Sequence, residues 1–211
     1  ERGSIMTLDF NTAEEQYDGP STDFSPIPDG TIVDAILTIK PGGAGPDGAL
    51  TQSQRSDAQY LQCEFTVTTG EFERRKFWSN LTVAGGSLDD KGQSKAGNIS
   101  KRTIRALLES CYAIEPKDMS EPAKAARTLS SYMDLNNLLA KVEVGIETYN
   151  DKDNNRLSRV VTPGMPEYKQ PIGPDGTVKA SAPAPSTQTE TQPSPQQVTS
   201  DQSGGEKPAW A

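Results

Sequence analysis

The sequence predicts a mostly β domain with one main helix, preceded by an extended acidic arm and followed by a disordered tail. Three observations lead to this expectation: short segments of alternating apolar and polar residues between positions 31 and 162, one segment with apolar residues at helical spacing, and an end rich in Pro, Ser, Thr and Gln. Only 33% of the 211 residues are hydrophobic and 6% are aromatic, which is too few for a chain that folds along its whole length.

Five segments have the period of two that is typical of a half-buried strand. A glycine-rich stretch from 41 to 58 separates the first expected strand from the second. Its composition predicts a polar loop of unusual length, and loops of that length are often functional. Gly70 is the expected turn of a hairpin formed by the second and third strands. The expected strands are Thr31 to Lys40, Gln59 to Thr69, Glu71 to Val83, Lys141 to Tyr149 and Arg156 to Thr162.

One main helix is expected between the third and fourth strands, from Ile99 to Tyr112, with Asn98 or Ser100 as its N-cap. A second, short helical segment is expected over Pro122 to Ser131. The resulting order, β-β-β-α-β-β, is that of the OB-fold, so we expect an OB-like five-stranded partly open barrel. A generic α+β domain is the alternative.

The composition divides the chain into four parts. Residues 1–5 read as a tag remnant ahead of Met6, and 6–28 as an N-terminal extended arm with one basic residue and six acidic residues in positions 1–28. Residues 29–165 form the expected OB-like domain, with 17 basic and 18 acidic residues. Residues 166–211 form the expected disordered tail, because they hold too few aliphatic residues to offset chain entropy.

Several function classes lose support from what the sequence lacks. It contains no histidine, which removes the commonest general base and transition-metal ligand, and its two cysteines, Cys63 and Cys111, lie outside any metal-ligand spacing. We therefore expect buried thiols, no enzyme activity, no cofactor and no metal, with a carboxylate-only magnesium nuclease as a remote alternative. No apolar run is long enough to span a membrane or to direct secretion, so we expect a cytoplasmic protein.

The segment from Phe72 to Trp78 interleaves three cations with aromatic residues. Strand alternation predicts Arg74, Lys76 and Trp78 on one face, where they could neutralise phosphates and stack bases at once. Sequence-tolerant binding of a single strand needs that combination. In the alternative reading the cations are merely solvated and Trp78 packs under a loop.

Other candidates surround this segment. Tyr60 falls on the polar face of the second strand, and Tyr149 and Arg156 bracket the last hairpin, where they could extend the binding groove. A second basic cluster enters the main helix, although exposed lysine and arginine also form the ordinary surface of a helix. Its residues are Lys95, Lys101, Arg102 and Arg105, and the last three are candidate nucleic-acid contacts.

Several of these motifs together resemble a phage family catalogued as domain of unknown function 669, which is common among replication and recombination genes. The resemblance covers about Leu8 to Thr162 and implies an OB-type protein that binds single-stranded DNA without cutting it. Ala140 stands where a glycine is usual, and the first loop is unusually long. The motifs are Ile27 to Thr31, Leu61 to Phe65, Gly70 to Trp78, Leu107-Leu108, Lys141 to Val144 and Asn155-Arg156.

The tail resembles the plan of bacterial single-stranded-DNA-binding proteins, in which a flexible linker ends in a short tip that recruits partners. Here the tip runs from Gly205 to Ala211, and Trp210 is the expected anchor for phage or host replication and recombination proteins, although the run of aspartates is missing. An inert solubilising tail is the alternative. For the whole chain, the alternative to strand binding is a protein-binding accessory or inhibitor built on the same fold.

Overall fold

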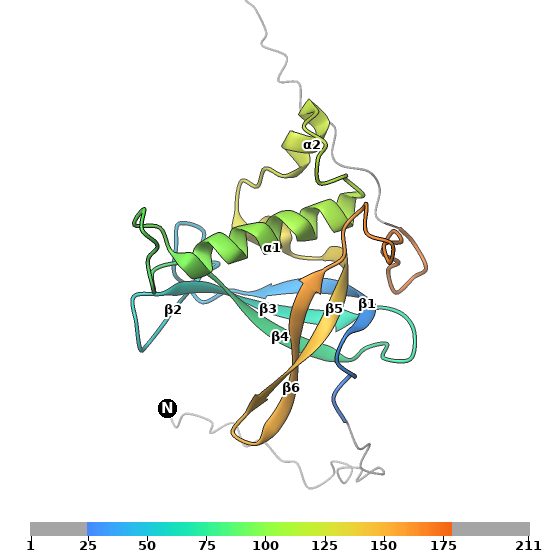
Figure 1. The fold of residues 1–211 in the computed structure, drawn as a ribbon, viewed down its shortest axis with the longest axis horizontal. Coiled ribbons are helices and arrows are strands. Elements are labelled where there is room, and N and C mark those ends of the chain that lie inside the picture. The colour runs from blue at the N-terminus through green and yellow to red at the C-terminus, as the bar shows by residue number, and fades with distance from the viewer. Residues whose placement is uncertain (1–24, 179–211) are drawn as a thin grey trace, which may run out of the picture.

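A computed structural model describes residues 25–178, which are mostly β with one main helix, as the sequence predicts; the antiparallel sheet has six strands where five were expected (Figure 1). The tag remnant, most of the acidic arm and Trp210 lie outside the described residues. The elements are β1 (Thr31–Lys40), β2 (Thr51–Gln52), β3 (Gln59–Val67), β4 (Lys76–Ala84), α1 (Lys95–Tyr112), α2 (Glu121–Ala126), the 3-10 helix η1 (Tyr132–Leu135), β5 (Leu138–Tyr149) and β6 (Lys152–Val160).

The strands follow the order β2-β3-β1-β5-β6. Strand β4 also pairs with β3, on the edge opposite to β1. Strands β4 and β6 therefore end the sheet on its two sides, and the curvature of the sheet brings them close to each other. No strand pairing joins them within residues 25–178. We call the facing edges of β4 and β6 the seam.

The core forms where the apolar positions of the strands alternate inward. Leu61, Phe65 and Phe77 are completely buried, and Phe65 stacks on Phe77 across the β3–β4 pair with ring centroids 5.1 Å apart. An aromatic pair directly across two strands stabilises their register. Because Phe77 points inward, its neighbours Lys76 and Trp78 point outward, as the alternation predicts.

Helix α1 lies along one side of the sheet, while the tip of the β5–β6 hairpin projects on the opposite side (Figure 1). The helix begins earlier than expected: Ser94, not Asn98 or Ser100, is the N-cap, and its Oγ accepts a bond from the Gly97 amide at 3.0 Å. A Cβ on Gly97 would lie 3.0 Å from the Val83 carbonyl oxygen. The glycine thus permits the close approach of α1 to β4, although it reads in the sequence as part of a loop.

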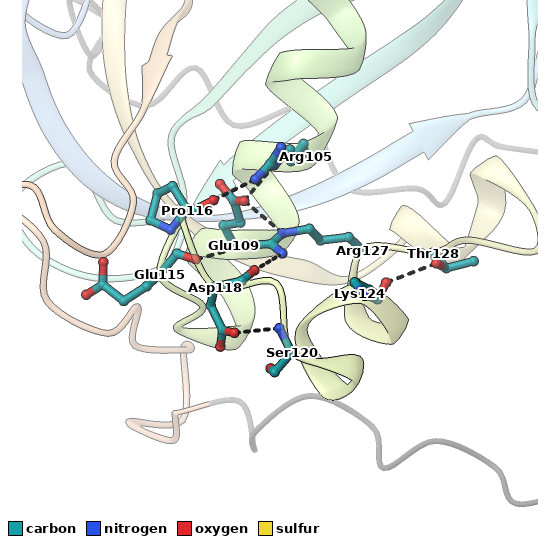
Figure 2. Close-up of polar contacts among 9 residues, drawn as sticks. All are labelled: Arg105, Glu109, Glu115, Pro116, Asp118, Ser120, Lys124, Arg127 and Thr128. Carbon is teal, nitrogen blue, oxygen red and sulfur yellow. Dashed lines mark hydrogen bonds and ion pairs between the residues drawn. The ribbon is translucent and has the colours of Figure 1, made fainter.

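A partly buried ion-pair cluster joins α1 to α2 (Figure 2). Glu109 Oε1 accepts bonds from Arg105 Nε at 2.7 Å and from Arg127 Nε at 2.8 Å. The same two guanidinium groups donate to loop carbonyls, Arg105 to Pro116 at 2.6 Å and Arg127 to Glu115 at 2.9 Å. We call Arg105, Glu109 and Arg127 the Glu109 cluster; it holds the loop between the two helices in place.

The glycine-rich stretch from 41 to 58 is not the polar loop that its composition predicts. Leu50 is buried in the core, and the two-residue strand β2 pairs with β3. Asp47 holds the stretch to η1, because its Oδ2 accepts bonds from the Ser131 hydroxyl at 2.6 Å and the Tyr132 amide at 2.8 Å. The part of the stretch that leads into β2 is therefore built into the domain.

Packed residues extend past both ends of the expected domain, 29–165. Ile27, placed in the arm by its composition, is completely buried, and its amide and carbonyl both bond to the Asn155 side chain. At the other end, residues 166–178 pack on the sheet: the Ile172 amide donates to Asp34 Oδ2 at 3.2 Å, and the Thr68 hydroxyl donates to the Ile172 carbonyl at 2.6 Å. Composition misses this segment because main-chain hydrogen bonds hold it rather than an apolar face.

None of the helices within residues 25–178 is long and apolar enough to cross a membrane.

Candidate nucleic-acid interface

The outward face of β3 and β4, together with the end of β1, gathers a carboxylate, two lysines and a tryptophan. Glu64 lies directly opposite Trp78 in the strand register. Its Oε1 pairs with Lys76 Nζ at 2.9 Å, and its Oε2 pairs with Lys40 Nζ at 3.3 Å and accepts a bond from Trp78 Nε1 at 3.2 Å. We call these four residues the Glu64 cluster; it carries a net charge of one positive unit.

Trp78 is held in place yet stays open to solvent. The bond from its Nε1 to Glu64 secures one edge of the indole, while 57% of the residue surface remains exposed. The hydrogen bond from Lys76, followed by the contacts with Lys40 and Trp78, keeps the pKa of the Glu64 carboxyl below its ordinary value, against the opposing effect of burial. The carboxylate is thus charged at neutral pH and accepts all three bonds.

Tyr60 shares this outward face, as the alternation of β3 predicts. It is half-buried and pairs with Thr51 on one side and Thr82 on the other. Four residues along β3 separate it from Glu64, which amounts to about 13 Å at roughly 3.3 Å per residue. Tyr60 and Trp78 are therefore spaced along one face rather than in contact.

Arg74 does not join the face on which alternation places it. It lies in the turn before β4 with a φ of 67°, where its amide donates to the Val67 carbonyl at 2.9 Å. This left-handed backbone interrupts the strand between Gly70 and Lys76, so the alternation starts only at Lys76. The Arg74 side chain is exposed and pairs with neighbouring Glu73 at 3.4 Å.

Arg156 lies across the seam from Trp78. Trp78, Asn80, Glu147 and Arg156 line one cavity of about 280 Å³. The guanidinium of Arg156 approaches Glu147 only to 3.8 Å, and both side chains are more than half exposed. The structure thus brings Arg156 beside the Glu64 cluster, although the two are far apart in sequence.

The other predicted residues lie elsewhere. Tyr149 is exposed at the end of β5, beside a tight turn in which Asn150 and Asp151 both have positive φ. Lys101 and Arg105 line a cavity of about 210 Å³ between α1 and the end of β4. Arg102 is exposed on the same helix, and Arg105 belongs to the Glu109 cluster. Their contact with nucleic acid stays a prediction.

Sequence reasoning missed three members of this region: Lys40, Glu64 and Asn80. The position of Glu64 on the polar face of β3 was readable, but its role depends on the β3–β4 register, which places it opposite Trp78. That register follows from the length of the turn between the strands, and the turn proved longer than a hinge at Gly70.

Metal ligands and free thiols are the remaining groups to place in the described part of the chain. Within 25–178, no group of three or more Cys, Asp or Glu side chains could hold a metal ion. Cys63 and Cys111 are buried free thiols, as predicted, and burial raises the pKa of the Cys63 thiol to about 12. Cys63 is therefore protonated and unreactive at neutral pH.

Comparison with known proteins gives no further assignment: no family model matches the chain, and no curated protein does.

Proposed function

We propose that the sheet is an OB-like, partly open barrel and that its β3–β4 face binds single-stranded DNA without cutting it. The strand pairings support the first part. Strand β1 pairs with β3 and β5, β3 pairs with β4, β5 pairs with β6, and α1 lies between β4 and β5. With the short β2 set aside, five strands in this arrangement have the OB order, and the seam is the open part of the barrel.

The observation that carries the binding proposal is the Glu64 cluster. An indole held by one edge, with more than half of the residue exposed, offers a stacking platform at a low cost in side-chain entropy. Base stacking tolerates any sequence because every base has a π-face. Two lysines beside the platform supply the charge that attracts phosphate.

The pairing of both lysines with Glu64 does not prevent such contacts. The side chains of Lys40 and Lys76 are 50% and 48% exposed, and exposed ion pairs contribute little net stability. Phosphate oxygens can therefore compete for the outward-facing ammonium protons. Residues 25–178 hold 18 basic and 20 acidic residues, so binding depends on this local arrangement and not on overall charge.

A protein-binding accessory remains the second candidate, because one observation favours it. Neither β4 nor β6 has a strand partner on its seam edge within the described part of the chain. An unpaired strand edge can accept an extended peptide from another protein.

The test is a fluorescence-anisotropy titration of the full chain with labelled single-stranded and duplex oligonucleotides at two salt concentrations. We expect single strands to bind more tightly than duplex, with affinity falling as salt rises, because counterions are released from phosphate on binding. Added magnesium or manganese should yield no cleavage products. Equal affinity for duplex, or no binding to either, would exclude the proposal and favour a protein partner.

A further inference from the structure

The seam contains a row of cavities that share lining residues. Three cavities follow one another along it, with volumes of about 160, 280 and 330 Å³. Trp78 lines the first two, and Asn80 and Arg156 line the second and third. We call this the seam groove. Pro26 lines it at one end and residues of α1, including Ile99 and Thr103, at the other.

The middle of the groove combines three kinds of chemical group. Trp78 contributes an aromatic ring and Asn80, two residues along β4, an amide that can donate and accept hydrogen bonds. Arg156 contributes a guanidinium from the opposite strand. The facing edges of β4 and β6 add main-chain groups without a strand partner among residues 25–178. A ring, an amide and a cation are the features that recognise the base and the phosphate of a nucleotide.

The acidic residue in this part of the groove, Glu147, does not prevent a phosphate from binding there. Glu147 faces Arg156 at 3.8 Å, and the two side chains are 62% and 53% exposed. A pair this long and this exposed is weak, so a phosphate can replace the carboxylate as the partner of Arg156.

We infer that the middle of the seam groove takes one nucleotide of the bound single strand, with its base on Trp78, the base edge at Asn80 and a phosphate on Arg156. This inference rests on the proposed function and extends it, because it leads the strand off the β3–β4 face and across the seam to β6.

The test uses the full chain carrying Trp210→Phe, so that Trp78 is the only tryptophan. An oligothymidylate with one 5-iododeoxyuridine is bound and irradiated, and the crosslinked peptide is identified by mass spectrometry. We expect adducts at Trp78 or at groove residues beside it. Asn80→Ala and Arg156→Ala, made separately in this background, should each lower affinity and crosslink yield several-fold. Lys117→Ala removes an exposed lysine that does not line the groove, and it should leave both quantities unchanged.

Two results would overturn the inference, and they can be told apart. If the oligonucleotide binds but the adducts lie away from the groove, and both groove variants bind normally, the strand takes another path and the proposed function stands. If the parent chain binds no single strand at all, the proposed function and this inference fail together.

Discussion

Two carboxylates in this domain each hold two cations, and their surroundings differ. Glu64 holds two lysines that are each about half exposed, on the outward face of the sheet. Glu109 holds Arg105, which is 48% exposed, and Arg127, whose side chain is only 11% exposed and which also donates to loop carbonyls (Figure 2). Both clusters combine one carboxylate with two cations, so both carry a net charge of one positive unit. The comparison teaches that solvent access and the remaining hydrogen-bond partners decide whether such a cluster can exchange partners with a ligand or can only hold the fold together.

The largest expected effect is on stability, from Glu109→Ala. The variant leaves Arg127 nearly buried without its carboxylate, and breaking a buried pair in this way costs about 3–5 kcal/mol. Urea unfolding should show that loss, while affinity for single strands below the transition stays unchanged. Glu121→Ala is the matched control, because its pair with Lys124 is exposed and should contribute little. If Glu109→Ala lowered the free energy of unfolding by less than about 1 kcal/mol, the Glu109 cluster would contribute no more to stability than an exposed ion pair, and the two clusters would not differ in this respect.

The next effect is on binding, from Trp78→Ala. Loss of one stacked base should weaken single-strand affinity by roughly 5- to 150-fold, the equivalent of about 1–3 kcal/mol. The unfolding midpoint should change little, because the indole is largely exposed. Trp78→Phe should recover part of the affinity. Full affinity in the alanine variant would show that the exposed ring stacks no base.

A smaller effect is expected from Lys76→Ala. Removing one phosphate contact should lower the slope of log affinity against log salt by about 1, with a similar loss for every sequence tested. Lys124→Ala, which removes an exposed cation from α2, should leave the slope unchanged. Equal slopes in the two variants would place the phosphate contacts outside the Glu64 cluster.

The smallest effect is expected from Glu64→Gln, and it has the opposite sign. The amide can still accept the bond from Trp78, but Lys40 and Lys76 lose their counter-charge, so single-strand affinity at low salt should rise a few-fold. Weaker binding would mean that the carboxylate itself positions the lysines for the strand.

The same variant has a pH signature. The pKa of Glu64 is lowered in the folded chain, chiefly by Lys76, so its contribution to stability is present above the ordinary glutamate pKa of 4.5 and is lost as pH falls through the lowered value. The stability difference between the parent chain and Glu64→Gln should therefore vanish in acid. A difference that persists there would come from packing rather than charge.

Local pattern predicted much of this molecule. The bounds of β1 match the prediction, and alternation correctly directs Lys76 and Trp78 outward, because a half-buried strand records its two faces in its sequence. The pattern failed at Arg74, where a left-handed residue belongs to a turn with no glycine at that position.

Long-range contacts account for the rest of what the sequence did not reveal. The pairing of Glu64 with Trp78 depends on a register between two strands, and the position of Arg156 beside Trp78 depends on the curvature of the whole sheet. The segment around Ile172 is held by main-chain bonds to Asp34 and Thr68. None of these leaves a mark in the composition or periodicity of its own segment.

The most direct test of the central claim compares two double variants in one single-strand titration. Lys76→Ala with Trp78→Ala removes the proposed platform, and Lys101→Ala with Arg102→Ala removes more charge from the exposed surface of α1. We predict a loss of at least about tenfold for the first and less than about twofold for the second, because stacking and local charge act together only on the β3–β4 face. A larger loss from the α1 pair would contradict the account and move the binding surface to the helix.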